Sequence, residues 1–195
     1  MTCLTGGGRE RLSSPAMQQT ETETQQWFAL RVYRNRTAPI REQCDKDGVQ
    51  YYIPMRLAER PGHDGPEYGE EPLIASLMFL RATEEYVGRL RRSSCNRVLP
   101  YCHPGTMQPA PIEERAMEMF MFVVKAGAGR AESVELSMLK GDRVRVTGGH
   151  FKGAEGYIMR IHGTRRFVVA VEGVAAVAVT HVPRQFLEKA GPCTP

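Results

Sequence analysis

The sequence predicts an α+β protein in two folded parts: an α+β sandwich with a four-stranded antiparallel sheet, then a small β-barrel. Three observations support this class. Aromatic and aliphatic strand-like runs alternate with helical patterns from residue 27 to 125. After residue 139 the pattern changes to short valine-rich strands separated by glycines. A Gly/Ala/Ser-rich stretch separates the two regions, and 195 residues suffice for two small domains.

The first region reads as strands and helices in the order βα-ββ-αβ-α. Strands are expected at 27–33, 49–54, 72–80 and 97–101, and helices at 38–47, from Thr83 onward and at 111–125. Residues 59–72 are rich in Pro, Gly and charge, so they form a loop or a flexible hairpin. The strand at 72–80 is apolar on both parities, which predicts a central position in the sheet.

The second region is organised around residues 139–158. Val144 and Val146 share one parity of a half-buried strand, and Gly148-Gly149 turns the chain. Phe151 is a lone aromatic at the tip of the loop, before a second strand starts at Tyr157. Further strands at 167–171 and 174–182, closed by 183–188, give about five short strands, as in an SH3-like barrel.

The flanking segments are polar. Residues 1–26 have almost nothing to bury and are predicted to be a disordered extension; 126–138 read as a flexible linker and 191–195 as a tail. The two folded parts, 27–125 and 139–190, are therefore expected to move as separate bodies. The chain shows no signal peptide or apolar run of membrane-spanning length, which favours a cytoplasmic location and no membrane partner.

Composition and motifs argue against catalysis. The five histidines are scattered, and no nucleophile elbow, phosphate-binding loop, zinc spacing or carboxylate pair stands out. We expect no catalytic residue, metal or cofactor. Residues 27–125 carry 14 Lys/Arg against 13 Asp/Glu, whereas 136–195 carry 9 against 4. The first part is thus better suited to a specific protein contact than to bulk binding of a polyanion.

The stretch 139–158 resembles a KOW motif. It carries the Gly141-Asp142 strand start, the alternating valines, a Gly-x-Phe-x-Gly loop at 149–153, and Gly156 before an aliphatic strand. This motif occurs in ribosomal proteins and in transcription elongation factors of the NusG family.

The region before it resembles the N-terminal (NGN) domain of the NusG family. Trp27-Phe28 corresponds to the opening Trp-Tyr strand, Tyr52-Ile53-Pro54 to a strand ending in proline, and 109–112 to the P-x-P-(I/V) before the last helix. Residues 71–80 match the "pLFPGYvFV" strand, except that Ile74-Ala75-Ser76-Leu77 replaces Phe-Pro-Gly-Tyr. That departure favours a specialised paralogue, similar to the UpxY and RfaH antiterminators.

The resemblance implies a non-catalytic, monomeric transcription factor that binds the clamp of RNA polymerase. It would support antiterminated elongation through one long operon, of the capsular polysaccharide type. Two alternatives stay open: an RNA- or ribosome-binding KOW protein acting in translation, and a general elongation and termination factor. Neither the target operon nor a second, helical fold of the barrel follows from the residues, although the β-branched run from 167 to 182 argues against such a switch.

The resemblance also suggests site residues. The polymerase-binding set comprises Tyr52, Pro54, Ile74, Leu77 and Phe79, with ordinary core positions as the equal alternative for each. The set for non-template DNA or nascent RNA comprises Arg31, Arg34, Arg36, Arg89 and Arg97. In the KOW domain, Phe151, Lys152, Arg143 and Arg145 are the partner-binding set, for a ribosomal small-subunit protein or Rho; Arg165 and Arg166 could join the arginines on RNA.

Overall fold

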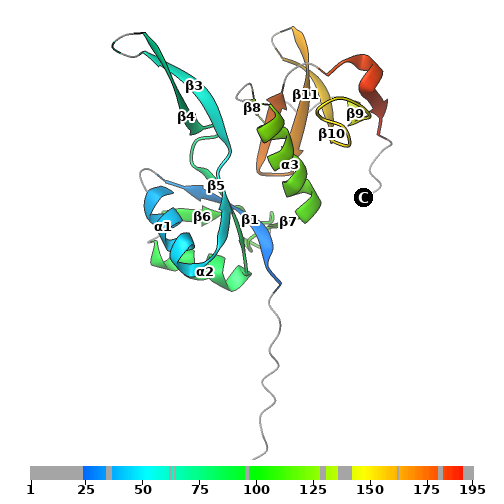
Figure 1. The fold of residues 1–195 in the computed structure, drawn as a ribbon. Coiled ribbons are helices and arrows are strands. Elements are labelled where there is room, and N and C mark those ends of the chain that lie inside the picture. Colours follow the sequence, from blue (N-terminus) through cyan, green and yellow to red (C-terminus); the bar gives the residue numbers. More distant parts are fainter. Residues whose placement is uncertain are drawn as a thin grey trace, which may run out of the picture.

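The computed structural model describes residues 24–33, 37–61, 63, 65–94, 97–127, 131–135, 142–161, 163–179 and 182–190. Nearly all of the predicted extension 1–26, the tail 191–195, and residues 128–130 and 136–138 of the predicted linker lie outside these ranges. The described chain forms three antiparallel sheets and three α-helices (Figure 1).

The first sheet has the order β2-β5-β1-β6, with β7 also paired to β1. Its strands are β1 (Gln26–Val32), β2 (Gln50–Tyr52), β5 (Leu77–Ala82), β6 (Val98–Pro100) and β7 (Pro111–Ile112). Strand β5 lies between β2 and β1 and is buried on both faces, so its predicted central position is confirmed. This sheet therefore needs cover on both sides.

Two helices cover one face of the first sheet. Helix α1 (Thr37–Asp47) contributes Ile40 and Cys44, and α2 (Glu84–Ser93) contributes Tyr86, Val87 and Leu90. These side chains pack on the same-face residues Phe28, Leu30, Met78 and Leu80. The Thr83 hydroxyl accepts a hydrogen bond from the Tyr86 N–H at 3.2 Å, which caps α2 as its sequence predicts.

Helix α3 (Glu114–Ala126) belongs to the opposite face. Its buried Phe120 packs on Phe79 of β5, with ring centroids 5.5 Å apart. Trp27, Ala29 and Leu77 belong to the same core cluster. The helix begins later than the predicted 111–125, because Pro111–Ile112 pairs with β1 instead of entering the first turn.

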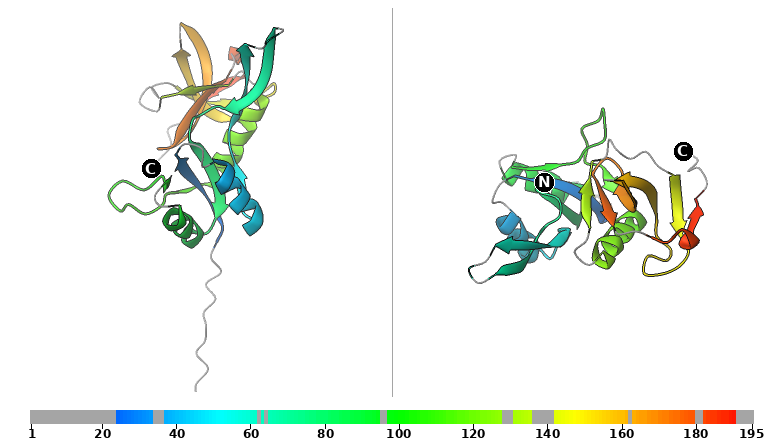
Figure 2. Two further views of the ribbon diagram at one scale, coloured as in Figure 1. Left: turned by 90° about the vertical axis from the view of Figure 1, so that its left-hand side faces the viewer. Right: turned by 90° about the horizontal axis from the view of Figure 1, so that it is seen from above.

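Strands β3 (Met55–Pro61) and β4 (Pro66–Pro72) form a two-stranded hairpin that projects from the first sheet (Figures 1 and 2). Of the two structures expected for residues 59–72, a loop or a flexible hairpin, the hairpin is the one observed. It also shortens the predicted strand 72–80: Pro72 ends β4, and β5 begins only at Leu77. The residues between them form a turn.

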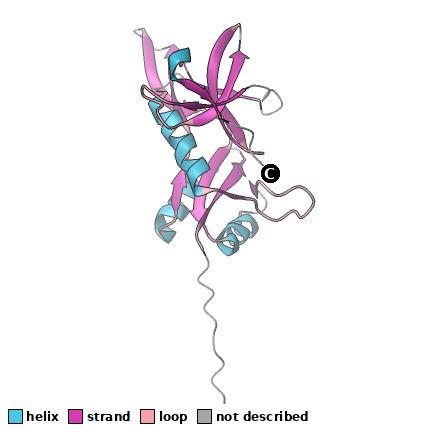
Figure 3. Ribbon diagram, turned by 90° about the vertical axis from the view of Figure 1, so that its right-hand side faces the viewer, coloured by secondary structure: helices cyan, strands magenta, loops and turns pink. Residues whose placement is uncertain are grey.

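The second sheet has the order β13-β9-β10-β11-β12-β8 and curves around itself (Figure 3). Its strands are β8 (Glu132–Val134), β9 (Asp142–Val146), β10 (Glu155–Ile161), β11 (Thr164–Val171), β12 (Ala175–Val179) and β13 (Leu187–Lys189), with the short 3₁₀ helix η2 (Arg184–Phe186) before β13. Strand β8 falls inside the predicted linker. That part of the linker prediction is wrong, because residues 132–134 pair with β12.

Helix α3 lies against both sheets. It contacts β1 of the first sheet and β11 and β12 of the second (Figures 1 and 3). One core cluster joins Phe79, Phe120 and Val179. Gly127, buried at its end, leaves room for Val179: an added Cβ would lie 3.2 Å from its Cγ1. The two sheets thus share a core in this structure, in contrast to the separate bodies expected from linker composition.

Gly156 makes a sharp test of packing in the second sheet. A Cβ at this position would meet the Val168 carbonyl oxygen and lie 2.9 Å from the Phe167 ring. Backbone cannot move aside cheaply, so Gly156→Ala should lower the free energy of unfolding by about 2–3 kcal/mol. Urea denaturation followed by circular dichroism measures this.

The matched control is Gly69→Ala in strand β4, where the nearest atom to an added Cβ is the Arg60 Cζ at 4.0 Å. This variant should change the free energy of unfolding by about 0.5 kcal/mol or less. Equal effects of the two substitutions would contradict the close approach of β10 and β11.

Candidate functional site

The first candidate surface lies where β2, β5 and α3 meet. Tyr52 is half-buried, its ring centroid is 6.3 Å from that of Phe79, and burial raises the pKa of its hydroxyl to about 12. Leu77 and Phe79 are only 3% and 0% exposed. In this conformation they occupy core positions, so of the predicted apolar set Tyr52 and Ile74 are the members that solvent reaches.

The turn between the hairpin and β5 positions Ile74. The Leu73 N–H donates to the Pro54 carbonyl at 2.8 Å, and the Val32 N–H donates to the Ser76 carbonyl at 2.7 Å. These bonds hold the buried Pro54 and the turn against β1. Ser76 adopts a positive φ of 63°, a conformation that favours glycine. Serine, at the position where the resemblance predicts glycine, thus adopts a conformation that glycine takes up more easily.

A polar cluster anchors the start of α3 on this face. The Trp27 indole N–H donates to the Glu114 carboxylate at 3.2 Å, and the Arg81 guanidinium lies 3.3 Å from the same carboxylate. Trp27 and Arg81 are directly paired across β1 and β5. The opening tryptophan thus both fills the core and fixes the position of the helix.

The predicted basic set of the first part is only partly brought together. Arg31 of β1 is exposed, its guanidinium carbon lies 5.7 Å from the Tyr101 ring centroid, and hydrogen bonding to Tyr101 raises its pKa. Arg97 is also exposed and sits on the neighbouring chain segment, where its carbonyl accepts from the Tyr33 N–H at 2.9 Å. Arg31 and Arg97 therefore lie on adjoining segments of the first sheet.

Arg89 is placed differently. It stacks on Tyr86, 5.0 Å from the ring centroid, and its charge helps to lower the pKa of Asp47, after the larger effects of hydrogen bonds from Gln43 and Tyr86. No described contact joins Arg89 to Arg31 or Arg97. Arg34 and Arg36 lie outside the described residues.

In the second sheet, Phe151 and Lys152 lie in the turn between β9 and β10. The turn is closed by hydrogen bonds from the Gly153 N–H to the Val146 carbonyl at 2.7 Å and from the Ala154 N–H to the Phe151 carbonyl at 2.9 Å. Phe151 is half-buried, with its ring centroid 6.3 Å from that of Phe167, and Lys152 is exposed. The turn therefore presents one aromatic face and one cation.

Glu155 forms ion pairs with the two arginines predicted to contact a partner. Its carboxylate lies 2.6 Å from Arg145 and 3.4 Å from Arg143, and 3.6 Å from Arg115 of α3. The hydrogen bond from Arg145 is the main reason that the pKa of Glu155 lies below its ordinary value. These cations are thus less available to a partner than the sequence suggests, and Arg115 links the helix to the second sheet.

The sequence did not predict a second group of basic residues, which lies on the second sheet. Arg160, Arg184 and Lys189 line one cavity together with Arg165. The hairpin register could have indicated part of it, because pairing of Ile161 with Thr164 places Arg160 directly opposite Arg165. Arg184 of η2 and Lys189 of β13 are distant in sequence from Arg160 and Arg165, and only the folded sheet brings them to the same cavity.

Among the described residues, no three His, Cys, Asp or Glu side chains gather as metal ligands would. Within the same ranges, no helix is long and apolar enough to span a membrane.

Comparison with known proteins agrees with the fold of the first part. Residues 25–121 match the family model described as "Transcription termination factor nusG". The chain therefore contains a NusG-family domain, which spans the first sheet, the hairpin and most of α3. No curated protein matches the chain.

Among solved structures, one described as "Domain interaction in Thermotoga maritima NusG" matches with 21% sequence identity. The match covers 85% of this chain and 97% of that chain, with a TM-score of 0.47.

The Glu155 network generates a pH-dependent prediction. Because the pKa of Glu155 is lowered on folding, its ion pairs stabilise the protein above the ordinary Glu pKa of 4.5 and are lost as pH falls below it. Glu155→Gln should lower the free energy of unfolding by about 1 kcal/mol at pH 7, since the arginines are solvent-exposed. Urea denaturation at pH 7 and pH 3.5 should show the difference shrinking at the lower pH.

Glu172→Gln removes a carboxylate for which no ion pair is observed among the described residues, and it serves as the control. A Glu155→Gln difference that stays constant between the two pH values would contradict the assigned ion pairs.

Ser76 gives a prediction of opposite sign. A side chain at positive φ costs about 1 kcal/mol, and glycine avoids that cost. Ser76→Gly should therefore raise the free energy of unfolding by about 0.5–1 kcal/mol, whereas Ser76→Val should lower it. Thermal unfolding of the three proteins measures this, and a lower melting temperature for Ser76→Gly would contradict the assigned turn conformation.

Proposed function

We propose that this protein is a non-catalytic transcription factor that binds RNA polymerase and favours its elongating form. The observation that supports this most strongly is the NusG-family domain at residues 25–121. Its apolar face, where β2 and the turn before β5 meet α3, is the surface proposed to contact the polymerase clamp. Preferential binding to the elongating conformation suffices to suppress pausing, because a ligand shifts an equilibrium toward the state that it binds better.

Tyr52 and Ile74 are the proposed contact residues. Both are half-buried and belong to the edge of the core around Phe79. Leu77, Phe79 and Pro54 are buried and support them from below. An amphipathic tyrosine and an aliphatic neighbour are suited to anchoring a protein interface.

The specialised role rests on the turn sequence. Ile74-Ala75-Ser76-Leu77 departs from the family's usual residues at the surface proposed to meet polymerase. We therefore infer an antiterminator dedicated to one long operon, of the capsular polysaccharide type, rather than the general factor. The exposed Arg31 and Arg97 are proposed to contact the non-template DNA strand, since guanidinium groups suit phosphates and bases.

The second sheet is proposed to be a KOW domain with an SH3-like barrel. The support is its glycine-bracketed turn with Phe151 and its sequential antiparallel pairing from β9 to β12. Phe151 and Lys152 are the proposed contacts for a protein partner such as a ribosomal small-subunit protein or Rho.

Two adjacent tyrosines allow a matched test of the polymerase surface. Tyr52 packs toward Phe79, whereas Tyr51 packs in the cluster under α1 and accepts a hydrogen bond from Arg41 at 3.3 Å. In the full chain, Tyr52→Ala should weaken retention of purified RNA polymerase core at least about tenfold, as loss of an interface anchor does. Tyr51→Ala should retain polymerase as the wild type does.

Circular dichroism must first show that both variants are folded. Equal retention by both variants would contradict the proposed surface. If the wild-type chain captures ribosomes but no polymerase, the protein acts in translation instead.

A further inference from the structure

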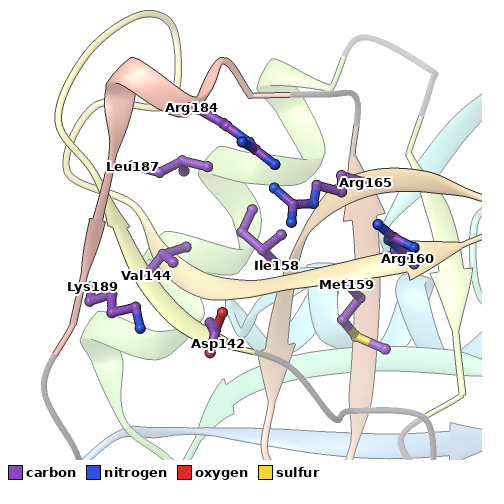
Figure 4. Close-up of a pocket in the computed structure, with 9 residues that line it drawn as sticks. All are labelled: Asp142, Val144, Ile158, Met159, Arg160, Arg165, Arg184, Leu187 and Lys189. Atoms are coloured by element: carbon purple, nitrogen blue, oxygen red, sulfur yellow. The ribbon is translucent and has the colours of Figure 1, made fainter.

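The second sheet contains a cavity of about 600 Å³ with an apolar floor and a cationic rim. Val144, Ile158 and Leu187 form the floor, from strands β9, β10 and β13. Figure 4 shows the Arg165 and Arg184 side chains extending toward one another past Ile158, with Arg160 beyond Arg165. Lys189 and Asp142 lie near Val144 on the other side. One opening therefore collects four cations around a single carboxylate.

The register makes this charge arrangement costly. Arg160 and Arg165 are directly paired across β10 and β11. Like charges directly opposite each other destabilise an antiparallel pair. Both side chains are exposed, and no ion pair to any described carboxylate is found for either of them. The same holds for Arg184 and Lys189 among the described residues.

Other arginines of the same sheet are treated differently. Arg166, next to Arg165, is held by Glu132 at 2.9 Å, and Arg145 is held by Glu155 at 2.6 Å. The sheet thus pairs Arg145 and Arg166, outside the cavity, with carboxylates, and leaves the four cations around the cavity with Asp142 as the one lining carboxylate. Three of the four positive charges therefore lack a counter-charge in the cavity lining. A bound anion would supply that counter-charge.

The lining indicates which anion. Several cations spread around an opening suit successive phosphates of a polymer better than one compact ion. The floor offers apolar contact to a base but no aromatic ring, so base selectivity should be weak. Asp142 repels phosphate, but its carboxylate can accept a hydrogen bond from a ribose 2′-hydroxyl, the group that distinguishes RNA from DNA.

We propose that this cavity, rimmed by Arg160, Arg165, Arg184 and Lys189, binds the backbone of single-stranded RNA, with little preference for sequence. The site lies on the second sheet and uses none of the residues proposed for polymerase contact. It can therefore fail or succeed independently of the polymerase-binding proposal.

The test is fluorescence anisotropy of the full chain with a labelled 12-nucleotide oligouridine, at several salt concentrations. Arg160→Gln/Arg165→Gln should weaken binding about tenfold at ~0.1 M salt and reduce the log–log salt slope by about 1.4, because each phosphate contact to a single strand contributes about 0.7. Arg143→Gln/Arg145→Gln is the matched control. It removes the same charge from the same sheet, but from arginines outside the cavity that share an ion pair with Glu155, and it should change binding less than about threefold.

Circular dichroism must show that the cavity variant is folded, and retained polymerase binding then separates the two proposals. Equal losses in the two double variants would overturn the cavity as the site. So would an absence of RNA binding by the wild-type chain.

A second arm tests RNA against DNA. Oligodeoxyuridine of the same length should bind the wild-type chain more weakly than oligouridine. Asp142→Ala should strengthen binding of both, through loss of repulsion, and should bring the RNA-to-DNA affinity ratio toward one. Equal binding of the two oligomers by the wild-type chain would overturn the assignment to RNA.

Discussion

The burial of α3 between two sheets is the interaction on which the rest of the structure depends. Its buried side chains, Met117, Phe120, Val123 and Val124, can each contribute about 1.5–3 kcal/mol by leaving water. Phe120 meets Phe79 of the first sheet, and Gly127 at the helix end gives Val179 of the second sheet close access. Trp27 and Arg81 fix the start of the helix through Glu114. Helix α3 thus covers the face of β5 that α1 and α2 leave open, and it packs the second sheet against the first.

Charge placement follows a second constraint. Glu155 and Glu132 neutralise arginines that lie on the second sheet, and Glu155 also reaches Arg115 of α3. Four cations of the second sheet for which no ion pair is described surround one cavity, and the exposed Arg31 and Arg97 lie on adjoining segments of the first sheet. The protein therefore combines an apolar surface suited to a protein partner with basic surfaces suited to nucleic acid, as expected for a factor that works on a transcribing polymerase.

Periodicity and capping predicted most of the fold because they are local signals. The strand at Trp27, the Thr83 cap and the glycine-bracketed turn around Phe151 all appear as expected. The misses are non-local. Pro111–Ile112 pairs with β1, and residues 132–134 pair with β12. For Leu77 and Phe79 the sequence left core and interface equally open, because the helix that packs on Phe79 lies about 40 residues away along the chain. The sequence did not predict the cluster of cavity cations, because β10, β11, η2 and β13 meet only in the folded sheet.

The central claim is that the apolar face around Tyr52 is where polymerase binds. Hydrogen–deuterium exchange of the full chain, with and without purified RNA polymerase core, tests it most directly. The account predicts slower exchange on binding in residues 50–54 and 73–77. It predicts little change in helices α1 and α2, which cover the opposite face of the first sheet. Protection confined to the α1–α2 face or to the second sheet, or no protection at all, would contradict the claim.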